Sequence, residues 1–242
     1  MEVRALVKRW LRQTGVEVQR YVPQTSDAAK LGKLFATHQV DCVFDVGANV
    51  GQYAEWLRGL GYGGRVVSFE PLTAAYSQLL SKKRYDDMWV VAPRMALGDF
   101  DGISEINVSE NLASSSLLRM EDAHLRAAPT SRIVGREEVK IGRLDSVFSQ
   151  WVGTARRPFL KIDTQGYEAH VLRGARDCLR HFVGVQAELS LCELYRGQEL
   201  FFDVSNRLRS SGFSLVGLFP AFADNETGRL LQVDGVFFRP EG

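Results

Sequence analysis

The stretch Val43-Phe44-Asp45-Val46-Gly47-Ala48-Asn49-Val50-Gly51-Gln52-Tyr53 reads as a buried strand, a glycine turn and the start of a helix. Glycines at 47 and 51 let the backbone come close to a ligand, and the first turn of the helix offers N–H groups without partners. A second strand predicted over 65–69 ends at Glu70 and Pro71, where a carboxylate suits the two hydroxyls of a ribose. The segment therefore predicts the first strand of an α/β domain that binds a nucleoside ligand.

The glycine turn departs from the Gly-x-Gly-x-x-Gly fingerprint of dinucleotide-binding domains. Asn49 stands where the second glycine is expected, and Gln52 where the third is expected. Because the second glycine lets a pyrophosphate approach the backbone, its absence favours a ligand without phosphate, of which S-adenosylmethionine is the common example. Two alternatives stay open: a nicotinamide dinucleotide, and a turn that only joins a strand to a helix.

Composition narrows the class of protein. At 242 residues the chain suits one large α/β domain with additions. Lys and Arg total 30 against 29 Asp and Glu, so the basic surface of a nucleic-acid-binding protein is not expected. Cys42, Cys178 and Cys192 are widely separated, which favours reduced thiols in a cytoplasmic protein. Without a long apolar run or a basic-then-apolar leader, we expect no membrane insertion and no export.

Residues 1–40 are predicted to form a helical extension ahead of a catalytic domain over 41–242. Apolar residues recur at helical spacing with basic residues between them, which predicts a short basic amphipathic helix; they are Val3, Leu6, Val7, Trp10 and Leu11. Such a helix packs on the core or on a second subunit of a homo-oligomer, or it lies on a membrane surface. A second helix is expected over 28–38.

From residue 41 onward, predicted strands and helices alternate, as in a parallel sheet that is covered by helices on both faces. Strands are expected over 41–47, 65–70, 88–95, 159–163 and 183–188, and helices over 51–60, 72–83, 143–151, 166–176 and 198–211. In such sheets ligands bind beyond the carboxyl ends of the strands. The side chains that end these strands are therefore predicted to surround one crevice: Asp45, Glu70, Asp163 and Glu188.

The last two predicted strands separate two kinds of α/β domain. Residues 213–219 and 230–238 are joined by a turn-rich connection without a helix, so the two strands should pair antiparallel. A reversed final strand is expected of the class I methyltransferase sheet, whereas a dinucleotide-binding domain stays parallel. We therefore predict a Rossmann-like class I methyltransferase fold, with a mostly parallel seven-stranded sheet, an antiparallel last strand and helices on both faces.

Between short strands expected over 101–108 and 137–141 lies a long irregular stretch. Long segments of this kind in compact domains are usually functional lids or disordered inserts, and we interpret residues 109–136 as a lid-like insertion that covers the substrate. His124, within it, is a candidate for contact with an acceptor hydroxyl, with a solvent-exposed loop histidine as the alternative. The four histidines show no zinc-binding spacing.

Short segments from about Cys42 to the end form a recognisable set. They are 44–51, Phe69-Glu70-Pro71, Ala96-Leu97-Gly98-Asp99 with Gly102, 114–117, Arg143-Leu144-Asp145, 161–168, Glu188 with 194–198, and 233–237. Together they resemble the FkbM family of S-adenosylmethionine-dependent methyltransferases. The resemblance implies transfer of a methyl group to oxygen, typically a hydroxyl of a sugar, polyketide or glycolipid.

The resemblance also implies the parts of a cofactor site. The turn lines the methionine part of the cofactor through Gly47, Ala48, Asn49, Gly51 and Gln52, and Asp45 lies near its amino group. Glu70, followed by Pro71, takes the ribose, while Ala96 and Leu97 lie against the adenine. For Glu70 the alternative is an acid that complements the dipole of the following helix.

Methyl transfer to an alcohol is an in-line displacement, so the acceptor must be positioned and must lose a proton. Asp163 is the predicted base, because it ends a strand above the expected sulfonium. Lys161 shares its face and is predicted to hold its charge or to act on the acceptor, with a purely structural salt bridge as the alternative. Glu188 is the second carboxylate; with Asp163 it is the one candidate Mg²⁺ site, although a metal is not expected.

The predicted acceptor site comprises Ser115, His124, Gln165, Glu193 and Tyr195. Trp56, Trp89 and Trp151 are expected to fill the core. The sequence thus predicts an O-methyltransferase that acts on a small-molecule or glycan acceptor. The alternatives are an NAD(P)-dependent oxidoreductase and a protein that binds S-adenosylmethionine without turnover or acts as a scaffold.

Overall fold

The computed structural model describes residues 2–16, 24 and 26–240, and the chain divides into two compact units, 1–37 and 38–242. The first unit contains helices α1 (Glu2–Gln13) and α2 (Asp27–Thr37), so both predicted N-terminal helices are confirmed. Leu6, Val7 and Trp10 of α1 are each more than half exposed. What covers this apolar face stays a prediction.

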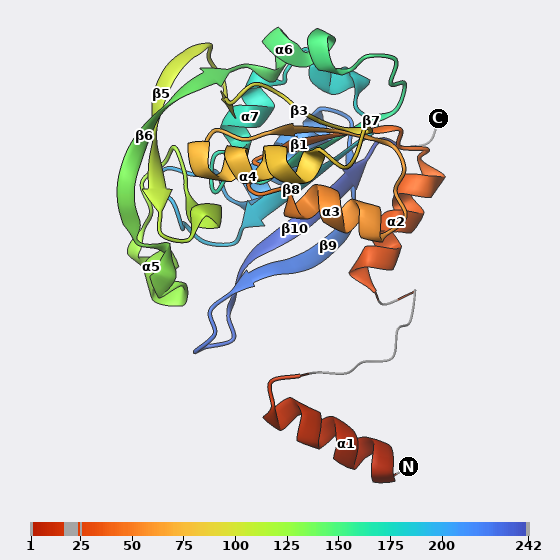
Figure 1. Ribbon diagram of the computed structural model, residues 1–242, viewed down its shortest axis with the longest axis vertical. Helices are drawn as coiled ribbons and strands as arrows, with labels where there is room; N and C mark the ends of the chain where they lie inside the picture. The colour runs from red at the N-terminus through yellow and green to blue at the C-terminus, as the bar shows by residue number, and fades with distance from the viewer. Residues whose placement is uncertain (1, 17–23, 25, 241–242) are drawn as a thin grey trace. The chain divides into compact units, whose positions relative to one another are not determined.

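A seven-stranded sheet forms the centre of the second unit (Figure 1). Its strand order is β3-β2-β1-β7-β8-β10-β9, with the strands β1 (Cys42–Val46), β2 (Arg65–Phe69), β3 (Trp89–Val91), β7 (Pro158–Ile162), β8 (Gly184–Ser190), β9 (Ser214–Ala223) and β10 (Leu230–Phe238). The first five are parallel, and β10 is antiparallel to both of its neighbours. The predicted class I methyltransferase sheet with a reversed last strand is confirmed.

Helices follow the strands at the predicted places: α3 (Gln52–Gly59), α4 (Thr73–Lys83), α6 (Leu144–Trp151), α7 (Glu168–Gly174) and α8 (Phe201–Ser210), with a 3₁₀ turn, η3, at Cys178–His181. Both β1 and β7 are buried along their whole length, as parallel strands between two helical layers must be. In the main core, Phe44 of β1 packs in one cluster with Phe148 of α6 and Leu172 of α7. Helices α3 and α4 are drawn in front of the sheet in Figure 1.

A second, three-stranded sheet has the order β4-β6-β5, with β4 (Ala96–Leu97), β5 (Gly102–Ser109) and β6 (Ile133–Gly142). The prediction of one strand over 88–95 is wrong. The strand ends at Val91, shortly before Pro93, and the chain then enters the second sheet at Ala96. The connection predicted over 220–228 also starts too early, because β9 continues past Pro220 to Ala223; β9 is an edge strand, where proline is tolerated.

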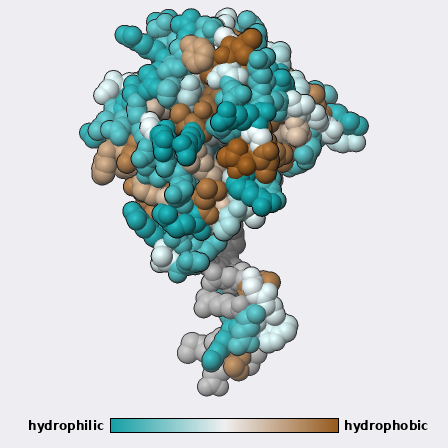
Figure 2. Space-filling view, turned by 90° about the vertical axis from the view of Figure 1, so that its left-hand side faces the viewer, coloured by the Kyte–Doolittle hydropathy of each residue, from teal (hydrophilic) through white to brown (hydrophobic). Residues whose placement is uncertain are grey.

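The insertion between β5 and β6 is more regular than the sequence suggests. It contains two 3₁₀ turns, η1 (Leu112–Ser114) and η2 (Pro129–Ser131), and the helix α5 (Asp122–Ala127). Figure 2 faces this side of the second unit and shows apolar patches separated by hydrophilic residues. None of the helices in the described part of the chain has the length and apolarity that a bilayer crossing needs.

Two glycines that each end a helix give a matched test of this packing. A Cβ at Gly174 of α7 would lie 1.8 Å from the backbone oxygen of Gly98, whereas a Cβ at Gly59 of α3 would meet nothing within 4 Å. We expect Gly174→Ala to lower the free energy of unfolding by about 1–3 kcal/mol through overpacking. Gly59→Ala should leave it unchanged or raise it by up to about 1 kcal/mol, because alanine favours helix. Urea unfolding of both variants checks this, and equal effects would contradict the close contact.

Candidate active site

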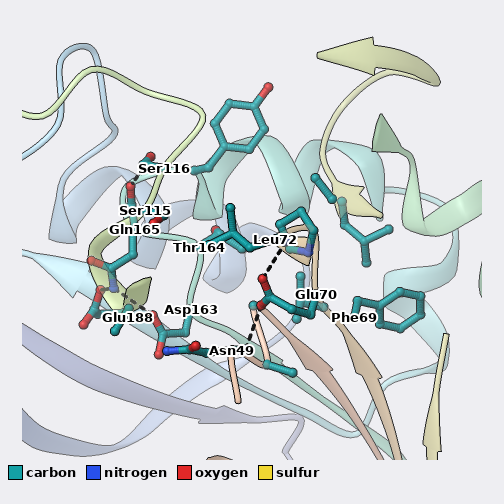
Figure 3. A pocket seen from close by; sticks show the side chains of 18 of the residues that line it. Asn49, Phe69, Glu70, Leu72, Ser115, Ser116, Asp163, Thr164, Gln165 and Glu188 are labelled. Carbon is teal, nitrogen blue, oxygen red and sulfur yellow. Dashed lines mark hydrogen bonds between the residues drawn. The ribbon is translucent and has the colours of Figure 1, made fainter. Parts of the chain in front are cut away.

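The carboxyl ends of the central strands open into a cavity of about 610 Å³, a size typical of small-molecule sites (Figure 3). Its walls come from the turn after β1, the residues after β2 and β7, the strand β4, and the 3₁₀ turn η1 of the insertion. The predicted crevice is therefore present, and part of the predicted lid contributes to its wall.

Glu70 marks one end of this cavity, directly after β2. Its side chain is buried, and its two oxygens accept hydrogen bonds from the backbone N–H groups of Asn49 (2.7 Å) and Leu72 (2.8 Å) (Figure 3). Burial raises the pKa of Glu70 to about 7, against the opposing effect of the two N–H donors. A carboxylate oxygen can accept more than one hydrogen bond. Glu70 can therefore accept hydrogen bonds from ligand hydroxyls while it still accepts those from Asn49 and Leu72.

Packing within the protein requires glycine at positions 47 and 51, whether or not a ligand approaches the turn. Gly47 has φ +79°, and a Cβ there would lie 1.9 Å from the backbone oxygen of Asp163. Gly51 has φ +89° and faces the ring of Trp89, outside the cavity wall. Gly47, Ala48, Asn49 and Gln52 do line the cavity. The buried Oδ1 atom of Asn49 has no hydrogen-bond partner within the described structure, so the wall offers an acceptor to a ligand.

A row of polar side chains crosses the sheet beneath the cavity. Strand register places Ser68, Asp45, Lys161 and Gln186 side by side on β2, β1, β7 and β8. Ser68 donates to Asp45 Oδ2 (3.3 Å), and Lys161 Nζ lies 3.4 Å from Asp45 Oδ1. Asp45 is fully buried and is absent from the cavity wall, so its predicted place beside a cofactor amino group is not the one observed.

Lys161 connects this row to the cavity. Its ammonium lies 3.2 Å from Asp163 Oδ2, as the shared strand face predicts, and only 6% of the residue is exposed. Burial by itself would lower the pKa of Lys161, but the charges of Asp163 and Asp45 outweigh it and raise the pKa above its ordinary value. Lys161 is therefore a fixed cation that holds Asp163 in place.

Gln165 links the two predicted catalytic carboxylates. Its amide Nε2 donates to Asp163 Oδ1 (2.9 Å) and to Glu188 Oε2 (3.0 Å) (Figure 3). Tyr195 donates to Gln165 Oε1 (2.8 Å) and so sets the orientation of the amide. Amide hydrogens thus point at both carboxylates, where a bridging Mg²⁺ would need oxygen ligands, and the arrangement does not fit the metal. No group of three or more metal-ligating side chains occurs among the residues described.

Several predicted acceptor residues lie elsewhere. His124 is buried in α5 between the rings of Tyr195 and Phe222, each 5.2 Å away, so both a substrate contact and a solvent-exposed loop histidine are wrong. Burial lowers its pKa to about 4, which leaves the ring neutral. Glu193 is exposed outside the cavity and accepts from the Gly197 N–H (2.7 Å). Tyr195 is fully buried and reaches the site through Gln165.

Other predicted site residues lie in the cavity wall. Ser115 lines the cavity, where its Oγ accepts from the Ser109 N–H (3.0 Å). Pro71, directly after Glu70, also lines it, as do Ala96 and Leu97 of β4 in the second sheet.

The sequence reading missed wall residues on α3 and β10. Trp56 was expected in the core but is 38% exposed and lines the cavity, together with Tyr53. Trp56 lies four residues after Gln52 and therefore on the same helix face, which is a usable signal. Asp234 is the register partner of Glu188 across β8 and β10, and the predicted antiparallel pairing contains this information.

Comparison with models of protein families shows to which family the chain belongs. The model of the methyltransferase FkbM domain matches residues 45–215, most of the chain. The chain belongs to this family. No curated protein matches its sequence.

Solved structures with a related architecture share little sequence with this FkbM domain. Magnesium protoporphyrin IX methyltransferase (ChlM) from Synechocystis PCC 6803 with bound SAM is 11% identical, with a TM-score of 0.45 over 99% of this chain and 98% of that one. TehB from Haemophilus influenzae is 10% identical, with a TM-score of 0.47 over 88% of this chain and 61% of that one. Fibrillarin from Aeropyrum pernix with natively bound S-adenosyl-L-methionine is 11% identical, with a TM-score of 0.45 over 81% of this chain and 66% of that one.

Removing the Lys161 cation tests the polar row. Lys161→Met leaves Asp45 buried without its cation, and we expect a loss of about 3–5 kcal/mol in the free energy of unfolding. Asp45→Asn in the same background should recover part of that loss. Lys82→Met removes a half-exposed ion pair with Glu55 (2.6 Å) and should cost about 1 kcal/mol or less. Urea unfolding measures all three variants, and similar losses for Lys161→Met and Lys82→Met would contradict the proposed network.

Proposed function

We propose that this FkbM-family protein is an S-adenosylmethionine-dependent O-methyltransferase that acts on a hydroxyl of a saccharide, glycolipid or glycosylated or polyketide metabolite. One observation carries the proposal: a single cavity has a buried carboxylate suited to a ribose at one end and, across β1 and β7, a carboxylate fixed by a buried cation. The first group suits a nucleoside, and the second suits removal of a proton from an alcohol.

The cofactor placement follows the cavity wall. Glu70 would accept hydrogen bonds from the ribose hydroxyls, and the apolar side chains of Leu97, Met95 and Leu72 would cover the adenine. The turn from Gly47 to Gln52 would hold the methionine part, where Asn49 Oδ1 is free to accept a hydrogen bond. S-adenosylmethionine, when bound, supplies the electrophilic methyl group.

The protein supplies positioning and a proton acceptor. Asp163 is the proposed base, since its side chain is 38% exposed to the cavity while its oxygens are oriented by Lys161 and Gln165. The raised pKa of Lys161 keeps this residue protonated, so it orients the base and does not itself remove the proton. Glu188 is linked to Asp163 through the shared Gln165 amide and would face the acceptor.

The alternatives have less support. A nicotinamide oxidoreductase would need room for a pyrophosphate at the turn, and Asn49 occupies that position with φ +49°. We also propose a cytoplasmic setting and a partner other than nucleic acid. Three free cysteines support the first, and the carboxylates of the cavity wall support the second.

Calorimetric titration with S-adenosylhomocysteine, beside NAD and NADP, tests the cofactor assignment. We expect the thioether alone to bind, with a dissociation constant of about 10 µM or lower at pH 8. Ribose hydroxyls donate to the ionised carboxylate, so protonation of Glu70 below its pKa of about 7 should weaken binding. The expected loss is about tenfold between pH 8 and pH 6.

Glu70→Gln is the control for this titration. It should weaken binding at pH 8 and flatten the pH dependence, because the titrating group is gone. Binding of NAD, or of none of the three ligands, would contradict the proposed function.

Replacing Asp163 by Asn tests the proposed base. With tritiated methyl donor and an acceptor found by screening saccharides and polyketides, kcat should fall about 10²–10⁴-fold. Affinity for S-adenosylhomocysteine should change little, because asparagine keeps the shape of the side chain and Glu70 is unchanged. Unchanged turnover would remove Asp163 from the mechanism.

A further inference from the structure

Three carboxylates gather at the end of the cavity opposite Glu70. Asp163 follows β7, and Glu188 and Asp234 face each other as direct register partners on β8 and β10. Carboxylates placed directly opposite each other across an antiparallel pair repel. A pair of this kind is costly to the fold, so its presence in a ligand cavity calls for a chemical reason.

Positive charge at this end is scarce. Lys161 is the one Lys or Arg side chain of the cavity wall within the described residues, and it is already paired with Asp45 and Asp163. Glu188 receives amide hydrogens from Gln165 and Gln232 (2.7 Å), and Asp234 receives one from Gln186. Neither Glu188 nor Asp234 forms an ion pair with another described residue through Lys, Arg or His. The two carboxylates are thus hydrogen-bonded but have no cationic partner.

The electrostatics agree with the geometry. Burial, followed by repulsion from Asp163, raises the pKa of Asp234 to about 6 and also raises the pKa of Glu188. Each proton-donating or cationic group that a ligand brings would relieve this repulsion, whereas an anionic group would add to it.

Aromatic side chains complete the wall on the helix side. Trp56 and Tyr53 of α3 line the same cavity with ring centroids 5.6 Å apart, and Lys161 already lies over the Tyr53 ring at 5.1 Å. The exposed face of Trp56 can receive a C–H face or a cation, but it offers nothing to an anion.

We propose that the acceptor end of the cavity selects for groups that donate hydrogen bonds or carry positive charge, so that the acceptor is a polyol or amino-polyol without carboxylate, sulfate or phosphate beside its reacting hydroxyl. The hydroxyl or ammonium groups of such an acceptor would face Asp163, Glu188 and Asp234. This inference rests on the proposed function, because it takes the cofactor to occupy the Glu70 end.

The affinities of two cofactor analogues test this preference for positive charge, and the test does not require that the acceptor be known. Sinefungin carries an ammonium group where the transferred methyl would stand, and S-adenosylhomocysteine has only a thioether sulfur there. Calorimetry at pH 8 should show sinefungin binding at least tenfold more tightly than S-adenosylhomocysteine. Equal or weaker binding of sinefungin would overturn the inference while leaving the proposed function intact. Binding of neither analogue would overturn the proposed function, and this inference with it.

Two variants assign the preference to residues. Asp234→Asn and Glu188→Gln each remove one negative charge and keep a similar shape, and each should reduce the ratio of the two affinities at least threefold. Asp87→Asn removes an exposed carboxylate outside the cavity and should leave the ratio unchanged. A ratio that survives both cavity substitutions would overturn the assignment of Asp234 and Glu188. Affinity for S-adenosylhomocysteine in each variant reports whether the cavity is still folded.

Discussion

The buried ammonium of Lys161 joins the interior of the sheet to the chemistry at its edge. It lies within 3.4 Å of Asp45, which is fully buried, and within 3.2 Å of Asp163, which faces the cavity. Taking charges out of water is costly, and here the cost is met only because each group has a partner and further hydrogen bonds. The position of Asp163 is therefore set by the whole polar row across four strands and not by its own loop.

The loop after β7 adds a second constraint. Glu168, buried at the start of α7, accepts from the backbone N–H groups of Thr164 (2.9 Å) and Gly166 (3.2 Å), and Gln165 is held at φ +55°. A Cβ at Gly166 would lie 2.9 Å from Tyr195 Cβ, so Tyr195 packs directly on this loop. The segment 161–168 thus carries both the proposed base and the hydrogen bonds that fix it, which explains why one short stretch contains so many polar residues.

Local patterns were sufficient to predict a mostly parallel sheet, its reversed last strand and three strand-end residues of the cavity wall, Glu70, Asp163 and Glu188, because strand direction follows from alternation and connection type. They also placed Lys161 and Asp163 on one face. The same patterns did not predict which polar side chains reach the cavity and which are buried away from it. Asp45 lies one row beneath the cavity because of strand register, and His124 is enclosed by Tyr195 and Phe222 from distant parts of the chain. Both depend on contacts that only the folded chain defines.

A crystal structure of the complex with S-adenosylhomocysteine tests the account most directly. It shows whether one ligand in this cavity reaches both Glu70, the carboxylate proposed to bind the ribose, and Asp163, the proposed base. The account predicts both ribose hydroxyls within hydrogen-bond distance of Glu70, adenine against Leu97, and the sulfur on the side of the cavity that faces Asp163. A ligand bound elsewhere, or one whose sulfur lies away from Asp163, would contradict it.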